Sequence, residues 1–277
     1  MKKHIWLITG ISSGLGQALA QAVMEAGDYV VGTLRQPEQI EQFNRQYADR
    51  GAAILLDITN PDAIQATVER VTSEFDRIDV LVNNAGVGFV GAVEEASIEE
   101  VRNVFEANFF GTLALTQAVL PRMRQQRKGH IVQISSHAGI KAFAGFGVYN
   151  ASKFALEGFS EALAQEVVPL GINVTIVEPG PFRTNFAGSR LGQAQQVIDD
   201  YATTAGAFRE KLKSVDGQQE GDPSKAARAI IDLVNSANPS LRLPLGKTAL
   251  KTIQMKLDSV AADLEANREI AERAVFM

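Results

Sequence analysis

Short apolar runs alternate along the chain with longer stretches in which apolar residues return every three or four positions. The short runs predict strands at 5–9, 29–34, 53–56, 80–83, 130–135, 172–177 and 241–245. Most of them are apolar throughout instead of alternating with polar residues, which is typical of parallel strands covered on both faces. The pattern therefore predicts an α/β protein with helices on both sides of one sheet.

The longer stretches carry the periodicity and the end signals of helices. Residues 15–26 place their apolar side chains on one stripe. Asn60 followed by Pro61 is a typical helix start, and Ser97 with Glu100 has the spacing of a capping box. Repeated strand–helix–strand units predict a Rossmann-type, doubly wound and mostly parallel sheet of seven strands.

The pattern favours a single dinucleotide-binding domain over residues 1–246. Within it, the region from about 186 to 221 shows no clear strand and mixes Gly, Ala, Gln and Asp, so we expect an inserted helical flap over a substrate. Residues 247–277 form a polar helical extension of the same domain, which we expect to pack on the body or to serve as an oligomer contact.

Composition and charge exclude several classes of function. The 277 residues carry a formal net charge of −5 with no basic stripe, which argues against a nucleic-acid partner. There is no cysteine, and the three histidines have no ligand spacing, so we expect no metal site. No apolar run approaches the length of a membrane span, so we expect no membrane partner and a cytoplasmic location.

Three glycines, Gly10, Gly14 and Gly16, lie where the first predicted strand passes into the first predicted helix. A dinucleotide pyrophosphate binds at such a junction through backbone N–H groups and the helix N-terminus. Glycine supplies the tight turn and the clearance that close approach of phosphates requires. Ser12 and Ser13 lie between them and could donate further hydrogen bonds; the alternative is a plain structural turn.

Six motifs in chain order resemble those of the short-chain dehydrogenase/reductase family. They are Thr9-Gly-Ile-Ser-Ser-Gly14-Leu-Gly16, Asn83-Asn-Ala-Gly86, Asn108, Ser136, Tyr149-Asn-Ala-Ser-Lys153, and Pro179-Gly180 with Thr184. The likeness covers about residues 3–246, and segments 33–35 and 149–158 are similar to the branch of hydroxysteroid and retinol dehydrogenases. The resemblance implies an NAD(P)-dependent oxidoreductase that forms a homodimer or homotetramer.

Tyr149 and Lys153 are four residues apart, so on a helix they share one face. A free phenol titrates near ~10, and a neighbouring ammonium favours the phenolate and lowers that pKa. Tyr149 could then give a proton to a carbonyl oxygen or take one from an alcohol. The alternative for an isolated pair is an ordinary surface contact on an amphipathic helix.

The family resemblance implies roles for the neighbouring residues. Its usual spacing of thirteen residues from serine to tyrosine selects Ser136 over Ser135 as the hydrogen-bond partner of the substrate oxygen. Asn108 matches the asparagine that holds a water linking the active-site lysine to solvent, with a helix kink as the alternative. His137 is interpreted only as a residue of the pocket wall.

The same resemblance implies the cofactor-binding residues. Lys153 would bind the nicotinamide ribose, Asp57 the adenine, and the segment from Pro179 to Thr184 the carboxamide. The full set is Gly10, Ser12, Ser13, Gly14, Leu15, Gly16, Arg35, Asp57, Ile58, Asn84, Ala85, Gly86, Tyr149, Lys153, Pro179, Gly180, Phe182 and Thr184.

The second predicted strand bears on the choice of cofactor. An NAD site places a carboxylate about 20 residues after the glycine-rich turn. Here that position is Leu34, and no Asp or Glu occurs between positions 29 and 37. Arg35 follows, and a guanidinium can bind a 2′-phosphate through two hydrogen bonds. We therefore expect NADP(H) in preference to NAD(H); the alternative is that Arg35 is a solvated residue at a strand end.

These features together predict an enzyme that transfers hydride between NADP(H) and the carbonyl or secondary alcohol of a small hydrophobic substrate. Phenylalanines are expected to wall the pocket: Phe89, Phe143, Phe146 and Phe186. The alternatives are an NAD-dependent alcohol dehydrogenase of the same family and a non-catalytic dinucleotide sensor. A sugar-nucleotide epimerase is disfavoured because too little chain follows position 177 for a second substrate domain.

Overall fold

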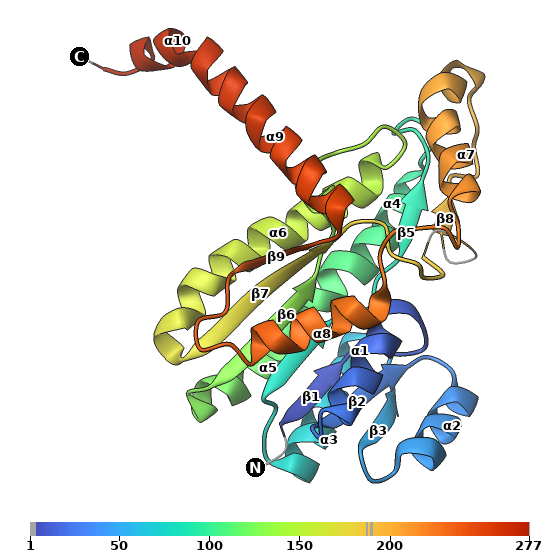
Figure 1. Cartoon of the computed structure of the whole chain (residues 1–277), viewed down its shortest axis with the longest axis vertical. Helices are drawn as coiled ribbons and strands as arrows, with labels where there is room; N and C mark the ends of the chain where they lie inside the picture. Colours follow the sequence, from blue (N-terminus) through green and yellow to red (C-terminus); the bar gives the residue numbers. More distant parts are fainter. Residues whose placement is uncertain (1–3, 187, 189–190, 277) are drawn as a thin grey trace.

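Seven parallel strands form the centre of the computed structural model, which describes residues 4–186, 188 and 191–276 (Figure 1). Their order across the sheet is β3-β2-β1-β4-β6-β7-β9. The strands are β1 (Ile5–Ile8), β2 (Tyr29–Leu34), β3 (Gly51–Leu55), β4 (Val80–Asn83), β6 (Gly129–Ile134), β7 (Ile172–Pro179) and β9 (Arg242–Leu245). This confirms the predicted Rossmann-type sheet and all seven predicted strands, to within a few residues at their ends.

The strand sequences are mostly apolar because a hydrophobic core covers each face of the sheet. In β1, Ile5 and Leu7 pack into one core while Trp6 and Ile8 pack into the other. All four side chains are buried, because successive residues of a strand point to opposite faces and both faces are covered.

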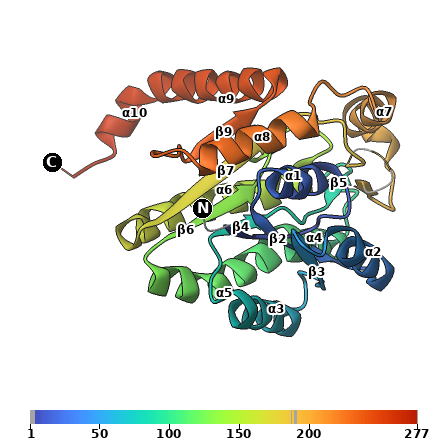
Figure 2. The same cartoon turned by 60° about the horizontal axis from the view of Figure 1, so that its bottom comes forward.

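Helices cover both faces of the sheet (Figures 1 and 2). On one side, α3, α5 and α6 contribute to the first core; on the other, α1, α2 and α8 contribute to the second. The bounds are α1 (Gly14–Glu25), α2 (Pro37–Tyr47), α3 (Pro61–Phe75), α4 (Ile98–Phe105), α5 (Gly111–Gln126), α6 (Gly147–Val167), α7 (Ala207–Ser214), α8 (Pro223–Val234), α9 (Lys247–Ala266) and α10 (Arg268–Arg273).

The predicted helix starts are confirmed in atomic detail. Asn60 accepts a hydrogen bond from the backbone N–H of Ala63 at 3.1 Å, which caps α3. Ser97 and Glu100 form both bonds of a capping box at the start of α4. Such caps satisfy N–H groups that the first turn of a helix leaves without partners.

One prediction about the region 186–221 is wrong. A strand does occur there, β8 (Leu191–Gln193), and it pairs in parallel with β5 (Gly88–Val90) to form a second, two-stranded sheet. The rest of the region contains two short helices (Asp199–Tyr201 and Ala202–Gly206) followed by α7. Positions 187 and 189–190 of the predicted flap lie outside the described residues.

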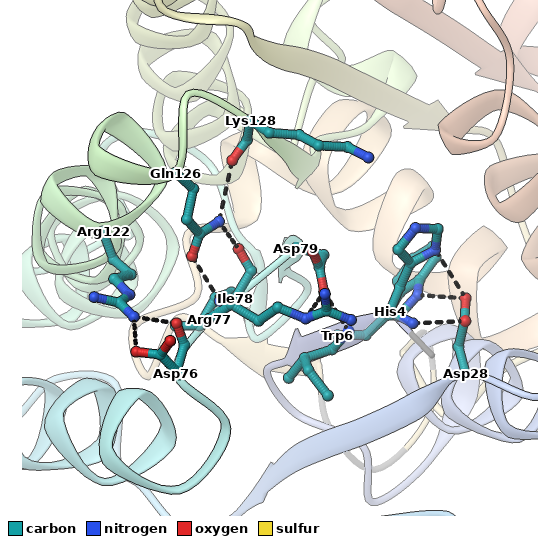
Figure 3. A network of polar contacts seen from close by, with 11 residues as sticks. His4, Trp6, Asp28, Asp76, Arg77, Ile78, Asp79, Arg122, Gln126 and Lys128 are labelled. Atoms are coloured by element: carbon teal, nitrogen blue, oxygen red, sulfur yellow. Dashed lines mark hydrogen bonds and ion pairs between the residues drawn. The ribbon is translucent and has the colours of Figure 1, made fainter. Parts of the chain in front are cut away.

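Polar side chains hold the amino ends of the central strands in place (Figure 3). Asp28 accepts from the backbone N–H of His4 at 2.9 Å and from the indole of Trp6 at 3.0 Å. Asp79 accepts from the backbone N–H of Ile5 at 2.8 Å. These bonds fix the amino end of β1, and the glycine-rich loop follows the other end of the same strand.

The sequence order of the strands reverses between β1 and β4. Ligands of open α/β sheets bind at the carboxyl ends of strands where the order reverses. Gly10, Asn84 and Ser136 follow the carboxyl ends of β1, β4 and β6. The topology therefore brings three of the predicted motifs to one crevice.

The C-terminal helices extend beyond this body. After β9 the chain enters α9, which projects away from the sheet and leads into the short α10 (Figure 1). Across the part of the chain that the structure describes, we find no helix with the length and apolar character needed to cross a membrane.

Candidate active site

A cavity of about 980 Å³ opens at the carboxyl edge of the sheet. It runs from the glycine-rich loop, past the ends of β2 and β4, to the N-terminal part of α6. All but one of the predicted cofactor-binding residues line it, and so do Ser136, Tyr149 and Lys153. The exception among the cofactor-binding residues is Gly16, and Asn108 also lies outside the lining.

The glycine-rich loop has a backbone that only glycine adopts easily. Gly10 and Gly14 have φ angles of +71° and +61°. A Cβ at Gly14 would come within 3.2 Å of the Thr184 side chain across the cavity. Ser13, the N-cap residue just before α1, makes no side-chain hydrogen bond that caps this helix. The N-terminus of α1 therefore faces the cavity with the geometry that binds an anion.

Gly16 does not line the cavity and leaves room for the Asn84 side chain to pack against the glycine-rich loop. A Cβ there would lie 2.3 Å from the amide nitrogen of Asn84 and 2.5 Å from the carbonyl oxygen of Gly10. Without it, Asn84 donates to the carbonyl oxygens of Thr9 at 2.8 Å and Gly10 at 3.1 Å. Asn84, directly after β4, thus fixes the shape of the loop after β1.

Arg35 and Asp57 stand together at the far end of the cavity. Both side chains are exposed and line the cavity from the ends of β2 and β3. Hydrogen bonds from the backbone and hydroxyl of Thr59 hold the pKa of Asp57 below its usual value, and the Arg35 guanidinium lowers it further. Arg35 directly follows Leu34, which occupies the position where NAD-specific sites place a carboxylate.

Tyr149 and Lys153 project from the start of α6 into the same cavity, as their spacing predicts. The Lys153 ammonium donates to the carbonyl oxygen of Ile134 at 2.8 Å and lies 6.0 Å from the centre of the Tyr149 ring. Tyr149 is 5% exposed and Lys153 is 6% exposed. The lysine is therefore held by the end of β6 beside the phenol.

The protonation of this pair differs from the expectation based on spacing. Burial raises the pKa of Tyr149 to about 12, and only a hydrogen bond with the side chain of Ser136 opposes the increase. Burial also lowers the pKa of Lys153 to about 8, against the attraction of the Glu157 carboxylate. Exclusion of water disfavours both charged forms, so the resting site holds a neutral phenol.

The two serines after β6 have different surroundings. Ser136 is the partner of the Tyr149 phenol, and its hydroxyl oxygen also accepts from the backbone N–H of Ala138 at 3.1 Å. Ser135 lies beside Glu157, where its hydroxyl partly offsets the increase in carboxyl pKa that burial causes. Only Ser136 is therefore a partner of the phenol that would act as acid or base.

Asn108 lies in a π-helical segment, Glu106–Phe110, between α4 and α5. Its side-chain oxygen accepts from the backbone N–H of Val87 at 2.7 Å, and its nitrogen donates to the Val87 carbonyl at 2.9 Å and to Ser152 at 3.0 Å. Asn108 thus connects the loop after β4 to α6, next to Lys153. A single π turn of this kind often occurs at a functional site.

One arginine lies among three glutamates behind Lys153. Arg242 of β9 donates to Glu157 at 2.5 Å and also contacts Glu178 and Glu161. The side chains of Glu157 and Glu178 are 6% and 1% exposed. Burial raises the pKa of Glu157, and burial with the charge of Glu157 raises the pKa of Glu178 to about 7.

His137 forms the part of the cavity wall next to Ser136. Its Nδ1 is 2.9 Å from the hydroxyl of Thr252 on α9, and its ring centre is 5.1 Å from that of Phe143. Burial lowers its pKa to about 4, so the ring is neutral. It lines the cavity next to Ser136 and lies against the base of α9.

The family model for short chain dehydrogenases matches residues 4–195 of the chain. A curated protein called 3-ketodihydrosphingosine reductase, from Bacteroides thetaiotaomicron, is 40% identical over 249 residues, with 89% of each chain covered. The chain belongs to the short-chain dehydrogenase/reductase family. Retinol dehydrogenase 8 of Homo sapiens is 37% identical to this family member over 254 residues, 85% of this chain and 79% of that protein.

Solved structures of short-chain dehydrogenases share the fold closely. One from Streptomyces avermitilis is 43% identical with a TM-score of 0.94, covering 99% of this chain and 100% of that one. A serine dehydrogenase complexed with NADP+ is 27% identical with a TM-score of 0.76, covering 87% and 94%. A protein from Burkholderia phymatum with NAD has a TM-score of 0.83 at 22% identity, which shows the fold alone. This short-chain dehydrogenase/reductase is thus an oxidoreductase of a fold that holds NADP or NAD.

The apolar end of the cavity contains residues that the sequence analysis missed. Phe143, Phe146 and Phe186 line it, whereas Phe89 does not and packs in a separate small core with Val104. Three apolar residues of the region after β8 complete the wall: Phe208, Leu212 and Val215. They are spaced four and three residues apart, which is the pattern of one apolar helix face and could have identified them from the sequence.

A buried ion pair attaches this wall to the body. Arg209 of α7 donates to Glu95 at 2.9 Å, and their side chains are only 10% and 2% exposed. Glu95 also accepts from the backbone N–H groups of Ile198 at 2.9 Å and Ala92 at 2.7 Å, and these bonds help to lower its pKa. The contact joins the segment after β5 to the helix that carries Phe208.

Proposed function

We propose that this enzyme interconverts a carbonyl and a secondary alcohol on a small hydrophobic substrate, with NADP(H) as the preferred hydride carrier and Tyr149 as the acid or base. One observation carries the proposal. A single cavity joins the glycine-rich loop and Arg35 at one end to Tyr149, Ser136 and an aromatic wall at the other.

The residues at the loop fit a dinucleotide. Gly10 and Gly14 leave space where side chains would intrude, and the N-terminus of α1 faces that space. Asn84, Gly86 and Gly180 line the middle of the cavity, and Lys153 stands at the end where the nicotinamide ribose would lie. When bound, the nicotinamide supplies or accepts the hydride.

The proton would come from the phenol. Tyr149 is neutral in the resting site, so in the reducing direction it can donate to the substrate oxygen. The Lys153 ammonium, one helical turn away, would favour the phenolate that remains, and its pKa of about 8 suits proton transfer near neutral pH. Ser136, the hydrogen-bond partner of the phenol, would donate to the same substrate oxygen as negative charge develops.

The substrate side of the cavity is apolar and aromatic. The rings of Phe146 and Phe208 meet at 4.7 Å, and Tyr149 lies 5.5 Å from Phe186. Such a wall favours a hydrophobic ketone or alcohol over a sugar or an amino acid. The relatives whose names specify 3-ketodihydrosphingosine and retinol support the same class of substrate.

Titration of NADPH and NADH, followed by nucleotide fluorescence, tests the cofactor preference. The unmodified enzyme should bind NADPH more tightly. Charge-assisted hydrogen bonds to a phosphate contribute about 1.5–3 kcal/mol, so Arg35→Ala should weaken NADPH binding by roughly 10–100-fold. NADH binding should change little.

The matched control is Arg45→Ala, an exposed arginine of α2 whose ion pair is with Glu41 on the same helix. It should leave both affinities unchanged. Equal or tighter binding of NADH by the unmodified enzyme would overturn the preference for NADP(H).

A further inference from the structure

Helix α9 is anchored at its base and uncovered along the rest of its length. Ala249 is fully buried, and Thr252 is 9% exposed and bonded to His137. Beyond this point the helix leaves the body (Figure 1). Leu257 is 56% exposed and Leu264 is 67% exposed. No other part of the chain within residues 4–186, 188 and 191–276 covers these two leucine side chains.

The apolar residues of α9 have the spacing of a coiled coil. Intervals of three and four residues alternate along the series Leu250, Ile253, Leu257, Val260 and Leu264. This is the a/d pattern of a heptad, in which each side chain fits between four residues of a facing helix. At a rise of ~1.5 Å per residue, the stretch of α9 from Leu250 to Leu264 provides a seam of about 21 Å. A second helix is therefore the partner that the pattern fits.

The charges of α9 are divided between its two halves. The first half carries three lysines at 247, 251 and 256, and the second carries three carboxylates at 258, 263 and 265. Lys256 and Asp263 have no ion-pair partner within residues 4–186, 188 and 191–276. An identical helix running in the opposite direction would bring each half against the oppositely charged half.

We propose that two copies of this chain pair through α9 in antiparallel orientation about a twofold axis near residues 258 and 259. In this register Leu257 of one copy faces Val260 of the other, and Leu264 faces Ile253. Lys256 of each copy then approaches Asp263 of the other. The contact is isologous, which means that the same surface of α9 is used by both copies.

The charge pattern argues against a membrane as the partner of α9. Helices that lie on membranes carry Lys and Arg along the polar face beside a broad apolar face. The six charges named above sum to zero and are separated along the axis, and the apolar residues form a narrow seam. A second copy of the helix matches both the separated charges and the narrow seam, whereas a lipid surface matches neither.

Sedimentation velocity of the full-length enzyme at micromolar concentration, with and without substitutions in α9, tests the pairing. Leu257→Glu should halve the particle mass. The matched control is Met255→Glu, which changes another exposed apolar residue of α9, 49% exposed and off the seam, and should leave the mass unchanged. Neither residue lines the cavity, so the affinity for NADPH serves as a check that both variants are folded.

A charge exchange tests the antiparallel register. Lys256→Asp should weaken the association by about tenfold, because it sets two carboxylates against each other. Adding Asp263→Lys should restore it. These two residues are two turns apart on one helix, so rescue requires contact between copies.

Three results would overturn the proposal: an unmodified enzyme with the mass of one chain, a Leu257→Glu variant with unchanged mass, or a charge exchange without rescue. Sedimentation with neutral lipid vesicles that is lost in Leu257→Glu would show instead that α9 binds membranes.

Discussion

The cluster around Arg242 predicts an unusual dependence of stability on pH. A single guanidinium contacts Glu157, Glu161 and Glu178, and two of these carboxylates are nearly inaccessible to water. One positive charge does not compensate two buried negative charges and a third at the surface. Burial and the charge of Glu157 therefore raise the pKa of Glu178 from 4.5 to about 7.

The sign of the effect follows from proton linkage. The folded enzyme binds the Glu178 proton more tightly than the unfolded chain, so Glu178 lowers stability as the pH rises from about 4.5 to about 7. One pKa unit corresponds to about 1.4 kcal/mol, so ionised Glu178 costs on the order of 3 kcal/mol of unfolding free energy at pH 8. The cost should almost vanish at pH 4.5.

Glu178→Gln removes this charge and keeps an oxygen that can accept from Arg242. We expect the variant to exceed the unmodified enzyme by ~2–3 kcal/mol in urea-induced unfolding at pH 8, and by less than ~1 kcal/mol at pH 5. His130 and His137 also affect stability, because burial lowers both pKa values to about 4. As the pH rises from about 4 to 6.5, both histidines increase the unfolding free energy of the unmodified enzyme and of Glu178→Gln alike. Their contribution therefore cancels in the difference between the two proteins.

Glu161→Gln is the matched control, since it contacts the same arginine but is 51% exposed. It should change the unfolding free energy by less than ~1 kcal/mol at either pH. If Glu178→Gln were no more stable than the unmodified enzyme at pH 8, the cluster would hold its carboxylates without cost and our reasoning would be wrong.

Three further substitutions, two of them paired with a control substitution, have expected outcomes. Ser136→Ala should lower kcat by on the order of 100-fold, because it removes the donor to the substrate oxygen, while Ser135→Ala should retain most activity in the same assay. Arg209→Met leaves Glu95 buried without its cation and should reduce the unfolding free energy by about 3–5 kcal/mol, whereas Lys213→Met, which removes an exposed ion pair, should cost under ~1 kcal/mol. Phe208→Ala should raise KM by about tenfold for a hydrophobic ketone with less effect on kcat.

The sequence was sufficient to predict the main sheet because both of its faces are covered. A strand such as β1 must then be apolar at every position, and this signal is local. The second sheet has no such signal. Its strands have three residues each and pair positions 88 and 191, which lie far apart in the chain.

The electrostatics of the site were beyond prediction for a similar reason. Arg242 lies 85 residues from Glu157 and 64 from Glu178. Nothing in the local pattern indicates that these charges meet under the active site. The spacing of Tyr149 and Lys153 correctly placed both on one face, but it could not show that burial would dominate their pKa values.

The central claim is that Tyr149 is the acid or base of a hydride-transfer reaction. The most direct measurement compares Tyr149→Phe with the unmodified enzyme on a panel of hydrophobic ketones, by NADPH absorbance, alongside the NADPH dissociation constant. Since this substitution removes a proton donor but almost no volume, turnover should fall by about 100–10,000-fold while NADPH binding stays nearly unchanged. A variant that kept more than about a tenth of the rate, a loss under ~1.4 kcal/mol, would contradict the account.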